Sequence, residues 1–426
     1  MKKIALITLV FLLTACEQSQ QITVEAEDTI KTAKEVPYEI AGLWRGVLAS
    51  PGGELPFGID ISKDKQGYTA KILNGEERAD TSSVEFSDKT ITINFEWFDA
   101  RIKAILSEDG KSMSGQWSKT ASGKDKTSML PFSASRGFDY RFKQELDEAI
   151  NTEATGNWEV TFSDDDGESL AVAEFSQNDQ ILTGTFLTPT GDYRYLAGSV
   201  NDNKLYLSAF DGAHAFLFDA EINNNKIING NFWSRESYHA TWDANKSADT
   251  SNFLPSSWEM NKITSSDNTA SFSFEDIGGN TVQLTDNRFK NKPVLINLFG
   301  TWCPNCNDEA PVLAEFYDKY NPQGLEIVGL AFEFTEDPVR DKRQLTAFKK
   351  RHGINYPLLL AGGNDKAKAT KILGFLDEVK SYPTTIFLDK NHQVKKIHTG
   401  FSGPGTGEHY QQLVSELENE ILELIK

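Results

Sequence analysis

The chain has 426 residues, more than one hydrophobic core usually organises, and its 39% hydrophobic and 11% aromatic content is sufficient for buried cores. Acidic side chains outnumber basic ones by 62 to 43, giving a formal net charge of −19. No basic stripe or arginine–aromatic cluster is present to neutralise phosphates, so we expect no nucleic-acid partner. These features predict a globular chain of two or three domains with a charged, solvated surface.

The first residues carry a targeting pattern. Two lysines precede an apolar run, residues 4–13, which is shorter than the roughly 20 residues of a membrane span. Residues 1–15 are therefore predicted to be a signal peptide. "LTAC" at 13–16 resembles the lipobox of bacterial lipoproteins, which implies a lipidated Cys16; an ordinary secretory signal with a chance cysteine is the alternative. Residues 16–40 are polar and are predicted to form a tether.

The lipobox resemblance also implies a location. A lipid on Cys16 would anchor the protein in a membrane of the cell envelope, facing the periplasm. Glu17 follows the cysteine, whereas an aspartate there retains lipoproteins at the inner membrane in enterobacteria. Outer-membrane attachment is therefore our hypothesis.

Two β-rich stretches follow the tether. "GLWRGVL" starting at residue 42 recurs as "GNWEVTF" starting at residue 156. Apolar and polar residues alternate in short segments separated by turn residues, which predicts an antiparallel meander closing into a barrel or sandwich. We predict β-rich repeats at 41–136 and 152–247, as two small barrels or two halves of one larger structure. Their Gly-x-Trp starts resemble those of lipocalin- or avidin-like up-and-down barrels.

Two connecting segments are predicted around the second repeat. Residues 137–151 form a helical connector, since Phe142, Leu146 and Ile150 lie at helical spacing. Residues 248–269 are polar and serine-rich and form a linker.

Aromatic and histidine side chains of the repeats are the remaining candidates for function there. We interpret five tryptophans as core residues, with a ligand cavity or docking face as the alternative: Trp44, Trp97, Trp117, Trp158 and Trp233. His214 and His239 have no partners at metal-ligand spacing, so no metal site is expected.

Residues 270–426 change character and alternate strands with helices. Strands are expected at 293–299, 325–333, 356–362, 383–389 and 394–401, and helices at 309–320, 340–353, 366–375 and 409–425. This alternation predicts an α/β domain. The whole chain is therefore expected to be multidomain α+β, with the repeated β-rich region first.

Two of the three cysteines flank a two-residue spacer where a buried strand gives way to a helix. At a helix start, backbone N–H groups and the helix dipole stabilise a thiolate, which attacks disulfides. Cys303 is thus the predicted attacking thiol, and Cys306 the resolving thiol that closes the Cys303–Cys306 disulfide. A zinc half-site would need a second pair of ligands, and the chain has no other Cys-x-x-Cys. A structural disulfide would close a longer loop, and two plain core cysteines are the last alternative.

Three motifs resemble the TlpA/ResA family of exported, thioredoxin-like thiol-disulfide oxidoreductases. They are "LINLFGTWCPNC" from residue 295, "CNDEAP" from 306 and "YPTT" from 382. The resemblance implies a thioredoxin-like fold for 270–426, a cis Pro383 facing the disulfide, and substrate contacts by Trp302 and Tyr382. An ordinary strand-edge proline is the alternative for Pro383.

The same resemblance implies a role for Glu309 near the thiols, tuning their pKa values or relaying a proton. Asn297 stands where ordinary thioredoxins carry a buried aspartate, so Glu309 is the better candidate for that role. A surface carboxylate on the first helical turn is the alternative, because acidic residues are favoured there.

The function implied is a membrane-anchored enzyme that exchanges dithiol and disulfide with exported proteins, without a cofactor. We expect it to reduce its substrates and to receive electrons from a membrane donor of the thiol-disulfide type. The spacer, Pro304 and Asn305, departs from the family's usual one, and this leaves the direction of transfer open.

Two other functions are possible readings of the sequence. The β repeats could be a ligand- or protein-binding module with an accessory redox domain. A peroxiredoxin-like peroxidase is the second alternative, but its P-x-x-x-[TS]-x-x-C motif is not supplied, because Gly300 stands at the Thr/Ser position. His352, His392, His398 and His409 are interpreted as surface residues.

Overall fold

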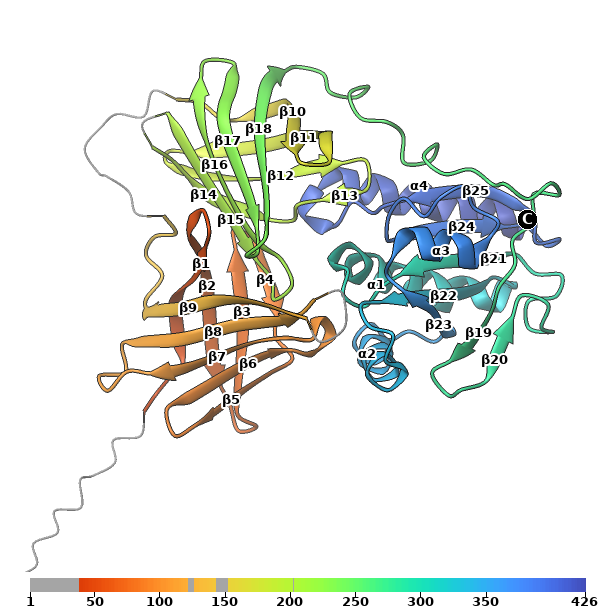
Figure 1. Cartoon of the computed structure of the whole chain (residues 1–426), viewed down its shortest axis with the longest axis horizontal. Coiled ribbons are helices and arrows are strands. Elements are labelled where there is room, and N and C mark those ends of the chain that lie inside the picture. The colour runs from red at the N-terminus through yellow and green to blue at the C-terminus, as the bar shows by residue number, and fades with distance from the viewer. Residues whose placement is uncertain (1–37, 122–125, 143–151, 202) are drawn as a thin grey trace, which may run out of the picture. The chain divides into compact units, whose positions relative to one another are not determined.

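The computed structural model describes residues 38–121, 126–142, 152–201 and 203–426, and Glu39–Lys426 form one compact unit (Figure 1). Three predictions lie outside the described residues: the signal peptide 1–15, the lipidated Cys16 and most of the tether 16–40. Within the described ranges, no helix is both long and apolar enough to cross a membrane.

The first β sheet is antiparallel and has nine strands. It follows the order β2-β1-β9-β8-β7-β6-β5-β3-β4, and β2 also pairs with β3, so eight strands close into a ring with β4 at its side. The strands are β1 (Gly42–Ser50), β2 (Gly53–Lys63), β3 (Tyr68–Asn74), β4 (Glu77–Asp80), β5 (Ser83–Ser87), β6 (Thr90–Phe95), β7 (Ala100–Leu106), β8 (Ser112–Thr120) and β9 (Thr127–Arg136). A short 3-10 helix, Glu96–Phe98, joins β6 to β7.

The second β sheet has nine antiparallel strands in the corresponding order, β11-β10-β18-β17-β16-β15-β14-β12-β13, and is closed by the pairing of β11 with β12. The strands are β10 (Gly156–Asp164), β11 (Gly167–Asn178), β12 (Ile181–Thr188), β13 (Gly191–Asp192), β14 (Leu196–Asn201), β15 (Lys204–Phe210), β16 (Ala215–Asn223), β17 (Lys226–Ser234) and β18 (Tyr238–Ser247). The predicted β-rich, barrel-like character of this part of the chain is confirmed.

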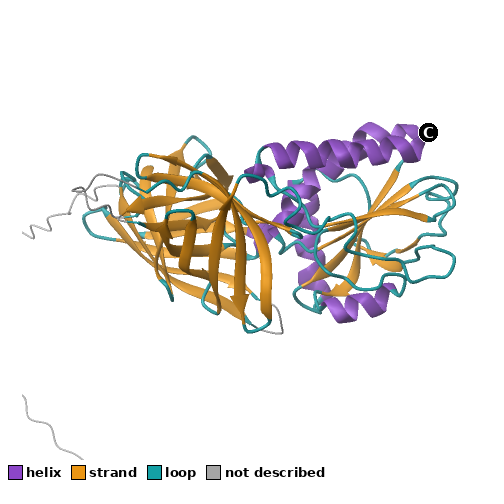
Figure 2. Cartoon of the chain, turned by 90° about the horizontal axis from the view of Figure 1, so that it is seen from above, coloured by secondary structure: helices purple, strands orange, loops and turns teal. Residues whose placement is uncertain are grey.

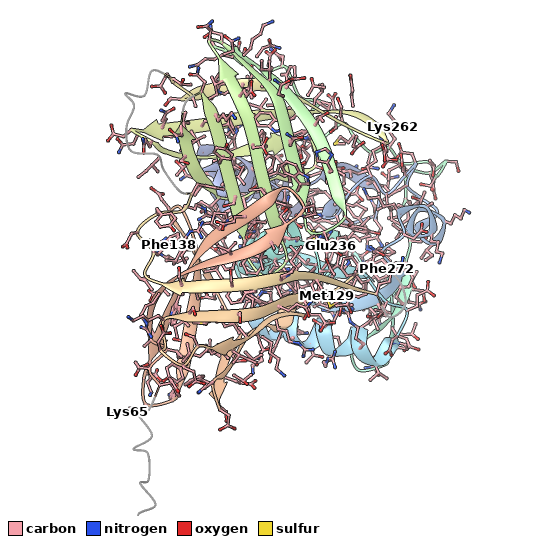
Figure 3. The ribbon with its side chains drawn as sticks, turned by 60° about the vertical axis from the view of Figure 1, so that its left-hand side comes forward. Lys65, Met129, Phe138, Glu236, Lys262 and Phe272 are labelled. Carbon is pink, nitrogen blue, oxygen red and sulfur yellow. The ribbon has the colours of Figure 1, made fainter. Side chains whose placement is uncertain are left out.

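Large side chains fill the inside of both sheets. Trp44 and Trp158 are fully buried. Each indole N–H donates a hydrogen bond of 2.9 Å to the backbone carbonyl four residues earlier. Trp97 and Trp117 are also buried, which agrees with their interpretation as core residues, whereas Trp233 is half-buried. Outward positions hold exposed residues such as Met129 on β9 (Figure 3). The alternation along each strand therefore separates core from solvent.

Replacing Trp158 with phenylalanine should lower the free energy of unfolding by about 1–2 kcal/mol, because the buried Ala154 carbonyl loses its donor and the smaller ring leaves a gap. Denaturant unfolding of the full chain measures this loss. Trp233→Phe is the matched control, since its ring is partly exposed. Equal losses in the two variants would contradict the prediction.

The connector differs from expectation in its described part. Residues 139–142 are not helical, and the rest of the predicted helix, 143–151, lies outside the described residues. The Arg141 guanidinium donates to the Leu73 carbonyl of the first sheet and to Ser208 of the second. The Phe142 ring lies 5.7 Å from that of Tyr206. These contacts hold Arg141 against both β sheets and Phe142 against the second.

The third sheet is mixed, in the order β20-β19-β23-β22-β21-β24-β25, and Figure 2 shows the α-helices beside this sheet. Its strands are β19 (Ser273–Asp276), β20 (Thr281–Gln283), β21 (Val294–Phe299), β22 (Glu326–Glu333), β23 (Leu358–Gly363), β24 (Thr384–Leu388) and β25 (Val394–Thr399). Its helices are α1 (Pro304–Tyr320), α2 (Pro338–Arg351), α3 (Lys366–Leu373) and α4 (Glu408–Ile425). The expected α/β elements are all present, and the hairpin of β19 and β20 was not predicted.

The neighbouring strands β22 and β21 lie in the middle of this sheet. Every residue of β21 and β22 is buried, as continuous apolar runs predict for parallel strands covered on both faces.

Residues 248–272 have no regular helix or strand, but the Trp258 ring packs against the His398 ring on β25, with 4.5 Å between the ring centres. His398 is therefore buried and not at the surface as predicted, and burial lowers its pKa to about 4.

Candidate active site

The two cysteines lie where β21 ends and α1 begins. Cys303 is the N-cap of α1 and Pro304 occupies the first helical position, where a missing N–H costs nothing. The Cys306 backbone N–H donates to the Cys303 sulfur at 3.4 Å. Both thiols are free and buried. Only 6% of the surface of Cys303 and 2% of the surface of Cys306 are exposed. Burial, and then the hydrogen bond of the Cys306 thiol to the neighbouring Cys303, raise the pKa of Cys306.

The turn before Cys303 is held by a buried carboxylate that the sequence analysis did not single out. Glu333, at the end of β22, accepts hydrogen bonds from the Thr301 backbone N–H (2.9 Å) and hydroxyl (2.8 Å). Glu333 is fully buried, and burial raises its pKa to about 7. An acidic residue directly after the apolar run of β22, the strand next to β21, was the available signal. Asn307 also braces the turn, donating to the Thr301 and Cys303 carbonyls.

Glu309 is buried and is not a surface carboxylate, which was the alternative interpretation of this residue. It lies on the inner face of α1 with 1% of its surface exposed. Asn297 on β21 donates to one of its oxygens (2.7 Å), and the Thr385 hydroxyl on β24 donates to the other (2.9 Å). Burial raises the pKa of Glu309 to about 7, although both hydrogen bonds oppose the shift. The carboxyl therefore titrates near neutral pH, close enough to Cys306 to raise the pKa of that thiol.

The other predicted site residues gather around Cys303. The peptide bond between Tyr382 and Pro383 is cis. The Tyr382 carbonyl accepts a hydrogen bond from the Cys303 thiol at 3.4 Å, so it already has a partner within the chain. The Trp302 ring lies edge-on to that of Tyr382 and its N–H donates to the Phe332 carbonyl at 2.8 Å.

The two histidines of the predicted β repeats, His214 and His239, have partners elsewhere in the chain. His214 contacts Asp211 and His239 contacts Asn231. Among the described residues, no group of three or more His, Cys, Asp or Glu side chains has a metal-binding arrangement.

Comparisons with known proteins find a matching family, similar sequences and similar structures. A model of the AhpC/TSA family matches residues 266–397. Thiol-disulfide oxidoreductase ResA of Bacillus subtilis is 31% identical over 143 residues, which cover 34% of this chain and 72% of that protein. ResA of Halalkalibacterium halodurans is 28% identical over 155 residues, covering 36% and 73%. A solved Chlorobium tepidum structure, described as a putative thiol:disulfide interchange protein DsbE, is 18% identical with a TM-score of 0.30, covering 39% and 100%.

The mixed sheet with its helices, together with these similarities, defines the class of the protein as a thioredoxin-like thiol-disulfide oxidoreductase. The two β-sheet regions before residue 248 lie outside the residues that the family model matches. By its similarity to the Bacillus subtilis protein, the chain belongs to the ResA family of thiol-disulfide oxidoreductases.

Proposed function

We propose that Cys303 and Cys306 form the redox-active dithiol of this enzyme and that it reduces disulfides of exported proteins. The observation that carries the proposal is the Cys303 sulfur at the N-cap of α1, accepting the Cys306 N–H. Partial positive charge at a helix N-terminus stabilises a thiolate there. Cys306, with its raised pKa, stays protonated until the second step.

The reaction proceeds by thiol-disulfide exchange. The Cys303 thiolate attacks one sulfur of the substrate disulfide, and the second substrate sulfur leaves as a thiolate that takes up a proton. Cys306 then loses its proton and attacks the Cys303 sulfur, releasing the first substrate sulfur. Two electrons pass to the substrate and the Cys303–Cys306 disulfide remains. Glu309, with a pKa of about 7, is the proposed acceptor of the Cys306 proton.

The substrate-contacting role of Trp302, Tyr382 and Pro383 is part of the proposal. Their support is position, since the Tyr382 carbonyl and the Trp302 ring adjoin Cys303. A peroxidase function is not proposed, because Gly300 occupies the position where its motif needs Thr or Ser.

We also propose that the enzyme works in the cell envelope, facing the periplasm, held to the outer membrane by lipid on Cys16. The "LTAC" sequence after a short apolar run supports this. A membrane thiol-disulfide protein would return electrons to the oxidised dithiol.

The domain boundaries predicted from sequence are proposed unchanged, with 41–136 and 152–247 as two copies of one repeat. The corresponding strand orders of the two sheets support this. Aromatic side chains fill both sheets, so a ligand-binding function of the β region has no specific support.

The decisive experiment is the reduction potential of the Cys303–Cys306 couple in the full chain, equilibrated with defined dithiothreitol or glutathione buffers. A value near or below that of thioredoxin, roughly −270 mV, is expected for a reductase. A value near −120 mV would mean an oxidant of exported thiols. If no reversible couple is found, the proposed function is wrong.

A further inference from the structure

A turn of the second β sheet lies against the spacer of the Cys-x-x-Cys motif. This covering turn, residues 188–192, joins β12 to β13. At Gly191 a Cβ atom would come within 1.7 Å of the Asn305 side-chain nitrogen, so the backbone there is in close contact with the spacer. Gly191 also has a φ of +152°, a backbone conformation that residues other than glycine rarely adopt. The backbone of the turn therefore lies closer to the Asn305 side chain than a residue with a Cβ atom would allow.

The same turn also contacts the loop after β25. A Cβ atom on Gly400 would lie 2.5 Å from the Thr190 carbonyl carbon. The Gly400 N–H donates to the Pro383 carbonyl, and the Asn305 amide donates to the Phe401 carbonyl. The covering turn therefore lies against the loop after β25, which is hydrogen-bonded both to Pro383 and to Asn305 of the spacer.

Two polar contacts hold the covering turn in place. The Asp192 carboxylate accepts the Gly403 N–H at 2.6 Å. Arg194, two residues further on, forms an ion pair of 2.6 Å with Asp308, which is on the first turns of α1. The Arg194 side chain is 13% exposed, and its guanidinium also pairs with Glu77 at 2.6 Å and Asp211 at 3.0 Å. Arg194 thus forms ion pairs with carboxylates of both β-sheet regions and of α1. Its removal would therefore release the turn from α1.

We propose that the covering turn is a specificity determinant of the enzyme, admitting thin or unfolded disulfide-bearing chains to Cys303 and excluding bulky folded ones. A substrate sulfur must reach bonding distance of the Cys303 sulfur, yet only 6% of this residue is exposed. Every bulky partner therefore has to displace neighbours of the dithiol. The inference rests on the proposed function, because it concerns the substrates of the same thiols.

The test compares two alkylating reagents on the reduced full chain carrying Cys16→Ser. Iodoacetamide probes the chemical reactivity of Cys303, and a polyethylene-glycol maleimide probes its access to bulk; mass spectrometry identifies the labelled cysteine. Arg194→Ala and the milder Asp308→Asn release the turn. Arg288→Ala is the matched control, since that arginine pairs with Glu326 on β22 of the third sheet, and this ion pair involves neither the covering turn nor the first two β sheets.

In both release variants we expect the maleimide rate to rise about tenfold relative to the iodoacetamide rate, since breaking a buried ion pair is costly for the docked state. The control should keep the ratio of the parent. Circular dichroism identifies a misfolded Arg194→Ala chain, in which case Asp308→Asn decides. An unchanged ratio in a folded release variant overturns the inference. Alkylation needs only a free thiol, so this result stands apart from whether the couple is redox-active.

Discussion

Cys303→Ser is expected to lower the rate of disulfide reduction by more than about a thousandfold, because a serine hydroxyl is no thiolate and forms no mixed disulfide. Cys306→Ser keeps the attacking thiol but cannot resolve, so a mixed disulfide with the substrate should accumulate. Non-reducing electrophoresis with an unfolded disulfide-bonded protein as substrate shows that adduct, and insulin reduction gives the rate.

The two serine variants serve as controls for each other, since both remove one buried thiol next to the same helix end. Adducts with Cys303→Ser and none with Cys306→Ser would reverse the roles of the two cysteines. Full activity of Cys303→Ser would contradict the proposed mechanism.

Glu309→Gln should flatten the pH dependence of stability. Burial raises the pKa of Glu309 from 4.5 to about 7. Between these values the folded chain keeps a proton that the unfolded chain releases, so stability falls as pH rises through this window and then levels off. The difference is roughly 3 kcal/mol for this one group. Denaturant unfolding at several pH values between 4 and 8 measures how much of the wild-type slope the variant loses.

Glu315→Gln is the matched control, since Glu315 is exposed on the same helix and should leave the slope unchanged. The Glu309 variant should also lower the pKa of Cys306, because the carboxylate is one of the groups that raise it. Thiolate absorbance against pH reports that shift. A slope equal to wild type would mean that the pKa of Glu309 is the same in the folded and unfolded chains.

The sequence predicted much of the third sheet because its signals are local. Continuous apolar runs mark β21 and β22, and Cys303-Pro304 marks the start of α1. The two-residue cysteine spacing is likewise visible without any tertiary knowledge. Alternation and turn residues similarly predicted barrel-like sheets.

Residues brought together from distant parts of the chain were not predicted. Glu333 reaches Thr301 only because β22 pairs with β21, and Arg194 reaches Asp308 only because the β region contacts α1. Neither residue has a neighbour in sequence that suggests its partner. The non-helical conformation of residues 139–142 was not predicted for the same reason, since Arg141 is bound by both β sheets.

The closure of the first sheet has a consequence for how the chain folds. The pairing of β1 with β9 joins Arg45 to Ser135, so the ring forms only after a long stretch of chain has been synthesised. Contacts of such sequence separation are associated with slow folding, because loop-closure entropy is lost before the contacts form. Cys303 and Cys306 follow both rings in the chain, so they are synthesised after every strand of the two rings. A slow phase in refolding is therefore to be expected from this topology.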